Sequence, residues 1–503
     1  MVENPREWFE TRVARLDNHL ECGILQEMKS FVLHSEKTVL NDVVHNVSLQ
    51  PLFDYLASSN QDIDVVCTII YELLSQLDPK ELFSTFEETI HRSLNHNSNE
   101  VKDIRLKLME RSINDDTVAV VVAKQMPLLI DAAECLASEE RSIAQRAISV
   151  FIKLGSNPTG ATAFYSSTLL KKLKDVMVIN DISRFRVYEL IVALSKFSPE
   201  NLEKGISSGL MEDLVSEVFS SDVLIQLNAL EILGNLATSN HGINYLSEKK
   251  VIQYLISKLQ KIQTEPLAPI LLPGLIEFFG NMCAYQPEQF TNEYPQVMSL
   301  LFSGIEENDE SLLGVTITSI GKVGSSCSGR NILKQHKDQM RRFFTKTQQF
   351  LNCKTDLAVT VVNSLSELLK KINGDASCNE ITEEWFDYMG FNATEVIVNL
   401  GKLPFIEIRL PALALLKTLA AHSWGAKKLC NYPGMIEYLL NRSSEYNKDC
   451  KQTKFDIVCN IVQSAGNSND FLNPDVLHTL KEFVKEGPFY VPLEVETAIE
   501  GAN

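Results

Sequence analysis

Hydrophobic residues recur along most of this chain with the spacing of helix faces. Nearly every long stretch has apolar side chains at i, i+3, i+4 and i+7, whereas sustained alternation of apolar and polar residues is almost absent. Proline cannot donate a backbone hydrogen bond and clashes inside a helix, so Pro79, Pro158, Pro199 and Pro474 mark expected helix boundaries. The pattern predicts an all-α fold of short helices joined by shorter loops.

One arrangement of helix, glycine turn and second helix repeats through the sequence. The helix Leu227–Ala237 and its copy Leu410–Ala420 have the same order of leucines around a small residue. A glycine follows in each of four strong copies, at Gly160, Gly242, Gly329 and Gly425. Weaker copies lie halfway between, which gives a unit of about 40–48 residues, the period of armadillo and HEAT arrays.

A repeat of this length exposes an apolar helix face that only stacked neighbours can cover. We therefore expect residues 1–503 to form one continuous, curved armadillo/HEAT-like solenoid. Within it we expect divergent N-terminal repeats over 1–140, clearer repeats over 141–480, and a C-terminal cap and tail over 481–503. The small residue in each copy lets neighbouring helices approach closely, and the leucine and isoleucine side chains fill the layers.

The helix after the recurring glycine turn is expected to line the inner side of the array, as in armadillo proteins. Its outward positions carry a tyrosine and a basic residue four apart in two copies of the repeat. Shared descent of the two copies is the alternative explanation of this likeness. The partner-binding residues predicted on this basis are Gln253, Tyr254, Lys258, Glu437, Tyr438 and Arg442.

Two short motifs resemble catalytic or phosphate-binding signatures, and neither has the required context. Residues 205–209 read G-x-S-x-G around Ser207, but no strand precedes them, so an interhelical turn with Gly209 at a helix boundary is the better interpretation. Residues 324–331 have the glycine spacing of a phosphate loop without its lysine. The nine histidines are dispersed. We expect no catalytic, cofactor-binding or metal-binding residues, and no enzyme.

Charge and cysteine positions narrow the choice of partners and location. The net charge is −18, so nonspecific nucleic-acid binding is not expected. Basic residues gather locally at 249–261, 322–330 and 337–342. Most are expected to lie on solvated helix faces, and some are expected to align a binding partner through electrostatic attraction. The ten cysteines lack a C-x-x-C pair, the N-terminus lacks a secretory pattern, and the most apolar window, 267–279, is too short to span a membrane. A cytoplasmic or nuclear location is expected.

Several segments resemble one family in particular, that of the 26S proteasome non-ATPase regulatory subunit 5. The resemblance is strong from about residue 140 to the end and weaker before that. It is carried by the segments 184–191, 272–281, 314–325, 384–386, 423–442, 486–491 and 498–502. Many of these positions are apolar and repeat with the helix period, so they indicate descent better than mechanism.

The resemblance implies a chaperone for assembly of the base of the proteasome regulatory particle, without an enzymatic activity. Such a protein would bind the C-terminal domain of an ATPase subunit and hold an ATPase pair with the large non-ATPase scaffold subunit until release. Neither a cofactor nor a membrane is implied. The alternative is a generic armadillo-type adaptor with another protein client; such arrays often carry ladders of tryptophan, and only Trp8, Trp385 and Trp424 occur here.

Overall fold

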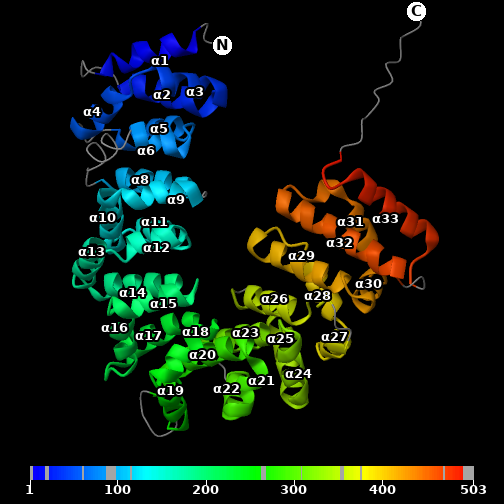
Figure 1. Cartoon of the computed structure of the whole chain (residues 1–503). Coiled ribbons are helices and arrows are strands. Elements are labelled where there is room, and N and C mark those ends of the chain that lie inside the picture. The colour runs from blue at the N-terminus through cyan, green and yellow to red at the C-terminus, as the bar shows by residue number, and fades with distance from the viewer. Residues whose placement is uncertain are drawn as a thin grey trace, which may run out of the picture. The chain divides into compact units, whose positions relative to one another are not determined.

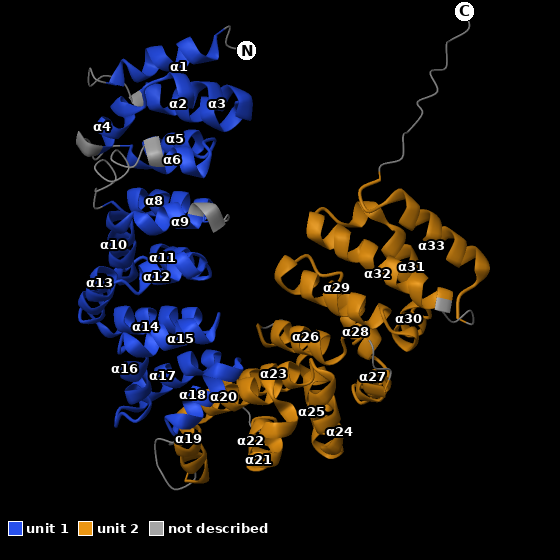
Figure 2. Ribbon diagram, viewed as in Figure 1, with its two compact units in different colours: residues 1–251 blue, residues 252–503 orange. Residues whose placement is uncertain are grey.

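The computed structural model describes residues 4–16, 22–58, 62–85, 98–113, 116–261, 268–306, 309–351, 356–373, 377–467 and 471–490. Every regular element within these residues is a helix (Figure 1). The chain divides into two compact units, Met1–Val251 and Ile252–Asn503, which are described separately (Figure 2). The all-α fold predicted from the hydrophobic period is confirmed.

Unit 1 contains the helices α1 to α18. Their bounds are α1 Pro5–Val13, α2 Cys22–His34, α3 Lys37–Asn46, α4 Gln50–Ser58, α5 Ile63–Leu74, α6 Pro79–Thr85, α8 Asn99–Ser112, α9 Asp116–Lys124, α10 Met126–Glu134, α11 Arg141–Gly155, α12 Pro158–Phe164, α13 Ser167–Met177, α14 Asp181–Ser195, α15 Pro199–Ser207, α16 Leu210–Val218, α17 Val223–Leu236 and α18 Asn240–Glu248.

Unit 2 contains the helices α19 to α33. Their bounds are α19 Val251–Gln260, with Val251 the last residue of unit 1, α20 Leu272–Tyr285, α21 Pro287–Glu293, α22 Gln296–Ser303, α23 Glu310–Val323, α24 Cys327–Gln335, α25 Lys337–Leu351, α26 Asp356–Leu368, α27 Ser377–Asp387, α28 Ala393–Leu400, α29 Ile406–Ala420, α30 Ser423–Cys430, α31 Met435–Leu440, α32 Lys448–Asn467 and α33 Pro474–Glu486.

From α11 onward the helices repeat in threes, and the first helix of each three is long. These first helices stack on one another more extensively than the second or third helices do: α11, α14 and α17 in unit 1, and α20, α23, α26, α29 and α32 in unit 2 (Figure 1). The small residue predicted in four of them is fully buried, at Ala147, Ala229, Thr316 and Ala412. The repeat found in the sequence is therefore a structural repeat.

The recurring glycine is required where the second helix crosses the end of the first. A Cβ atom at Gly160, Gly242, Gly329 or Gly425 would overlap the carbonyl oxygen of Leu154, Leu236, Val323 or Leu419, respectively. The overlap is with backbone, which cannot move aside as a flexible side chain could. Glycine at this position lets the chain turn back onto the first helix in each repeat.

Replacing Gly242 by alanine is expected to lower the free energy of unfolding by about 1–3 kcal/mol, because the added methyl group forces the two helices apart. Urea unfolding followed by circular dichroism measures the loss. Gly466 provides the matched control, since it is also helical and nothing lies within 4 Å of a Cβ placed there. Equal stability of the Gly242→Ala and Gly466→Ala variants would contradict this role of the turn.

The first helices also depend on the repeat that follows them. The carbonyl groups in the last turn of a helix have no partner within that helix. Asn201 of α15 donates to the carbonyl of Gly155 at 3.2 Å, His241 of α18 donates to that of Ser195 at 2.9 Å, and His422, just before α30, donates to that of Leu369 at 2.7 Å. Each side chain thus caps the first helix of the preceding repeat.

The domain boundaries predicted from the sequence stay predictions. The division after Val251 separates two compact groups of repeats and does not coincide with 140 or 480. The expected C-terminal cap corresponds in part to α33, whose Leu480 and Phe483 are buried. The rest of the expected tail, 491–503, lies outside the described residues.

Candidate binding face

Neighbouring first helices of unit 2 lie so close that the backbone of a glycine on one helix contacts a serine side chain on the next. A Cβ at Gly280 of α20 would lie 2.6 Å from the Cβ of Ser319 on α23, and one at Gly321 of α23 would lie 2.9 Å from that of Ser364 on α26. Small residues therefore permit the tight stacking. Because these helices pack more closely than the second and third helices, their exposed faces line the inner side of the stack within unit 2.

A groove of about 450 Å³ crosses the exposed faces of α20, α23 and α26. Its charged lining residues are Glu277, Glu310, Asp356 and Lys322. The ammonium of Lys322 donates to Asn281 at 2.9 Å and lies 3.6 Å from the carboxylate of Glu277. Glu310 and Asp356 are exposed and leave the groove with an excess of negative charge, which suits a partner's basic side chains.

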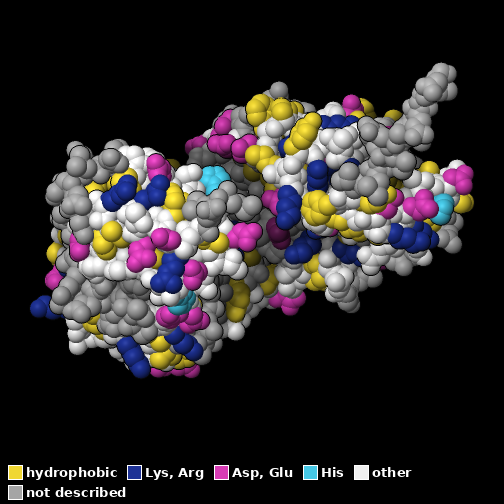
Figure 3. All heavy atoms as spheres, turned by 90° about the horizontal axis from the view of Figure 1, so that it is seen from above, with side chains coloured by type: hydrophobic (Ala, Val, Ile, Leu, Met, Phe, Trp, Pro, Cys, Tyr) yellow, Lys and Arg dark blue, Asp and Glu magenta, His cyan; other side chains and the backbone are white. Residues whose placement is uncertain are grey.

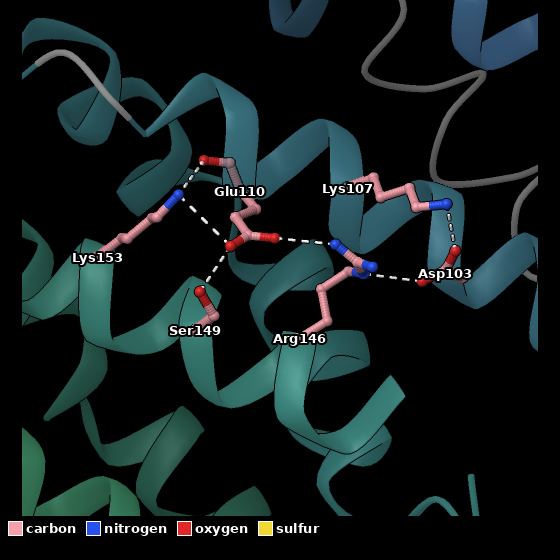
Figure 4. Close-up of polar contacts among 6 residues, drawn as sticks. All are labelled: Asp103, Lys107, Glu110, Arg146, Ser149 and Lys153. Atoms are coloured by element: carbon pink, nitrogen blue, oxygen red, sulfur yellow. Dashed lines mark hydrogen bonds and ion pairs between the residues drawn. The ribbon is translucent and has the colours of Figure 1, made fainter. Parts of the chain in front are cut away.

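In unit 1 an internally paired charge cluster joins α8 to α11, the helix at which the row of first helices begins. Figure 4 shows Arg146 of α11 between two carboxylates of α8, at 2.8 Å from Asp103 and 3.1 Å from Glu110. Ser149 donates to Glu110 at 2.6 Å, and Lys153 lies 3.4 Å from the same carboxylate. The bonds from Ser149 and the two cations outweigh burial and lower the pKa of Glu110. This cluster ties α8 to α11.

The predicted residues of α19 lie on its outer side. Gln253 is exposed, Tyr254 and Lys258 are half-buried, and the Lys258 ammonium lies 5.9 Å from the centre of the Tyr254 ring. The tyrosine and the lysine expected to share one face therefore do so. The helix α19 is a third helix of its repeat, outside the row of tightly stacked first helices that lines the inner side within unit 2.

The corresponding residues of α31 have structural contacts instead. The hydroxyl of Tyr438 lies 2.8 Å from the carbonyl oxygen of Gly401 and 3.2 Å from a carboxylate oxygen of Glu445, so its proton bonds one or the other, and burial raises its pKa. Arg442 lies 2.9 Å from Glu486 and 3.9 Å from the centre of the Phe483 ring. Both side chains are half-buried and have partners within the chain, because the end of α31 packs against α33, and their predicted role in partner binding stays a prediction. Glu437 is exposed.

The catalytic-looking motifs prove to be repeat turns. Ser207 is the last residue of α15, and its hydroxyl donates to the carbonyl of Glu203 at 2.8 Å. Gly209 precedes α16 with φ of 83°, a left-handed conformation that favours glycine, as expected of a helix boundary. In the second motif Ser326 caps α24 by accepting from the backbone of Gly329.

Within the described residues, no group of three or more His, Cys, Asp or Glu side chains is placed to hold a metal ion. None of the helices in these ranges has both the length and the apolar character needed to cross a membrane. On the face shown in Figure 3, acidic and basic side chains are interspersed with hydrophobic ones.

The repeated three-helix units define a helical-repeat solenoid protein. Yeast importin-beta (Kap95p) has a similar fold, with a TM-score of 0.58 and 12% identity over 96% of this chain and 61% of that one. The sequence profile of the proteasome non-ATPase 26S subunit family matches residues 6–503. The chain belongs to that family, and its role is related to the proteasome.

Relatives with an assigned name match nearly the whole length. The chain is 31% identical to the 26S proteasome non-ATPase regulatory subunit 5 of Bos taurus and 30% identical to that of Homo sapiens, in each case over 98% of both chains. It is 25% identical to the subunit of the same name from Drosophila melanogaster over 99% of both chains. The family resemblance seen in the sequence is confirmed.

The acidic groove on the first helices was missed by the sequence analysis. The helix pattern did contain a signal, because Glu277 and Thr318, which both line the groove, occupy equivalent outward positions between the buried residues of α20 and α23. The sequence analysis assigned the inner side to the helix after the glycine turn and therefore predicted binding residues on α19 and α31. The close approach of glycine and serine between first helices is what identifies the row.

Proposed function

We propose that this protein is a chaperone for assembly of the base of the proteasome regulatory particle. It binds the C-terminal domain of an ATPase subunit and holds an ATPase pair with the large non-ATPase scaffold subunit until release. It works as a binding surface in the cytoplasm or nucleus, without a catalytic step or a cofactor. The observation that carries the proposal is the family match over residues 6–503, and the helical-repeat fold supports it.

The direct test is affinity purification of the tagged full chain from cell extract, followed by mass spectrometry. We expect proteasomal ATPase subunits and the large scaffold subunit without the peptidase subunits of the core particle. Recovery of complete proteasomes would indicate a resident component instead. Recovery of an unrelated client without ATPase subunits would favour the alternative, a generic armadillo-type adaptor.

Release is proposed to result from steric conflict with incoming subunits. The test is a competition experiment with an immobilised ATPase C-terminal domain, to which chaperone and core particle are added in turn. We expect each to exclude the other. A stable ternary complex of ATPase domain, chaperone and core particle would contradict this mechanism.

The proposed contact on α19 is tested by Tyr254→Ala combined with Lys258→Glu. We expect about tenfold weaker binding of the ATPase C-terminal domain and an unchanged melting temperature, because neither side chain is part of the buried core. Isothermal titration calorimetry and thermal unfolding measure the two effects. The equivalent pair on α31, Tyr438→Ala with Arg442→Glu, should instead lower the melting temperature, since those side chains hold the last repeat to α33.

The acidic groove on the first helices is tested by Glu310→Lys combined with Asp356→Lys. If a basic surface of the client enters the groove, reversing both charges should weaken binding about tenfold or more and make the remaining affinity less sensitive to salt. The variant Glu380→Lys with Glu383→Lys changes the net charge equally at exposed positions of α27. Equal losses in the two variants would show an effect of net charge and exclude the groove.

A further inference from the structure

The helix α25, the third helix of the repeat that begins at α23, has a basic exposed surface, whereas the chain as a whole is acidic. A groove of about 360 Å³ lies between α25 and the turn that follows α22. Ile305 and Glu306 line one side of it, and Arg341, Arg342 and Lys346 line the other. Three cations against one carboxylate give the groove a positive charge, whereas the chain as a whole has a net charge of −18.

One cation of this groove already binds a carboxylate. The guanidinium of Arg342 lies 3.2 Å from the carboxylate of Glu306, and both side chains are 67% exposed. Arg341 is held differently, with its guanidinium 5.1 Å from the centre of the Tyr388 ring. Among the described residues, neither Arg341 nor Lys346 has a carboxylate within 4 Å. The groove therefore retains capacity for further carboxylates.

An exposed aromatic side chain borders the same surface. Phe391, in the turn between α27 and α28, has a relative exposure of 102%. The turn is fixed beside α25, because Gln348 of α25 donates to the side chain of Asn392 at 3.0 Å. A large apolar side chain with no contact of its own lies ready to be buried by a partner. Arginine and aromatic residues are the types enriched at protein interfaces.

We propose that Arg341, Arg342, Lys346 and Phe391 form a docking surface, called here the α25 surface, for an acidic segment of a partner protein that also carries an apolar side chain. Carboxylates of the segment bind the cations, and its apolar side chain covers Phe391. Nucleic acid fits less well, since Glu306 and the overall negative charge repel a phosphate backbone. The α25 surface is separate from the groove on the first helices, and its test does not depend on the proposed chaperone function.

The test uses the full chain and a fluorescein-labelled peptide of glutamates interrupted by leucines, with binding followed by fluorescence anisotropy at low and moderate salt. Arg341→Glu combined with Lys346→Glu should weaken binding about tenfold or more and abolish its salt dependence. Phe391→Ser should weaken binding of this peptide and leave binding of a leucine-free glutamate peptide unchanged. Because Phe391 has no packing contacts, its replacement should not change the melting temperature.

The matched control is Lys481→Glu combined with Lys485→Glu, which changes the net charge by the same amount on the exposed side of α33. This variant should bind the peptide as the unaltered chain does. Equal weakening by the control pair, or absence of peptide binding at low salt, would overturn the proposal. Tighter binding of a single-stranded oligonucleotide of equal charge would show that the surface selects nucleic acid and would overturn it as well.

Discussion

Replacing Arg330 by methionine is expected to lower the free energy of unfolding by about 3–5 kcal/mol. The side chain is fully buried on α24. Its guanidinium donates to the carbonyls of Gly324 at 2.9 Å, Lys370 at 2.5 Å and Cys378 at 3.2 Å. Methionine has a similar length and no donor, so these carbonyls would lose the partner that Arg330 provides. Burial lowers the pKa of Arg330, because removal from water disfavours its charged form.

Urea unfolding of the full chain, monitored by circular dichroism, measures this loss. Arg342→Met is the matched control, because Arg342 has one exposed ion pair, and exposed pairs contribute only about 0–1 kcal/mol. If the two units unfold in separate transitions, the midpoint of the transition of unit 2, which contains Arg330, should fall and that of unit 1 should stay unchanged. Similar midpoints for the Arg330 and Arg342 variants would show that the buried bonds contribute little net stability.

Acid is expected to destabilise the protein through His422, by up to about 3 kcal/mol. The imidazole is buried, donates to the carbonyl of Leu369 and stacks on Trp424. Burial is the main cause that lowers its pKa from 6.5 to about 4, with the nearby charges of Lys371 and Arg330 acting in the same direction. Below pH 6.5 the imidazole of His422 binds a proton in the unfolded chain but stays neutral in the folded chain until the pH approaches 4. Stability is therefore full above pH 6.5 and falls as the pH drops toward 4.

The measurement is the free energy of unfolding in urea between pH 7 and 4.5. In the His422→Gln variant the amide can still donate a hydrogen bond but does not titrate, so the slope of stability with pH should be smaller by about 1.4 kcal/mol per pH unit. His478 is exposed, and His478→Gln should keep the slope of the unaltered chain. If His422→Gln and the unaltered chain lose stability in parallel, other groups govern the acid response.

The repeat and its packing could be predicted from the sequence because they depend on local periodicity. Apolar spacing identified the helices, and the glycine after each strong copy marked a turn that the structure explains by a backbone overlap. The small residue at Ala229 and its equivalents is buried as expected. These features depend on neighbours along the chain, which a single sequence displays.

Residues whose environment depends on distant segments could not be predicted. Arg330 was counted among surface basic residues, yet its partners come from α26 and α27, about one repeat away. Tyr438 and Arg442 copy the outward positions of α19, but their repeat meets α33 and Glu486. The pattern of one repeat cannot show which segment packs against the C-terminal copy of that repeat. For the same reason the groove at Glu310 and Asp356 became visible only once three consecutive first helices were placed together.

The capping of α11, α14 and α26 by the repeat that follows each of them gives the array a direction. Asn201, His241 and His422 each complete the first helix of the preceding repeat, so these three repeats rely on their C-terminal neighbours for hydrogen bonds that they cannot make themselves. Deleting repeats from the C-terminal end would leave bare carbonyl groups on the new last repeat. Deletion from the N-terminal end would leave every remaining first helix with the repeat that follows it. Shortened chains should accordingly tolerate loss of their beginning better than loss of their end.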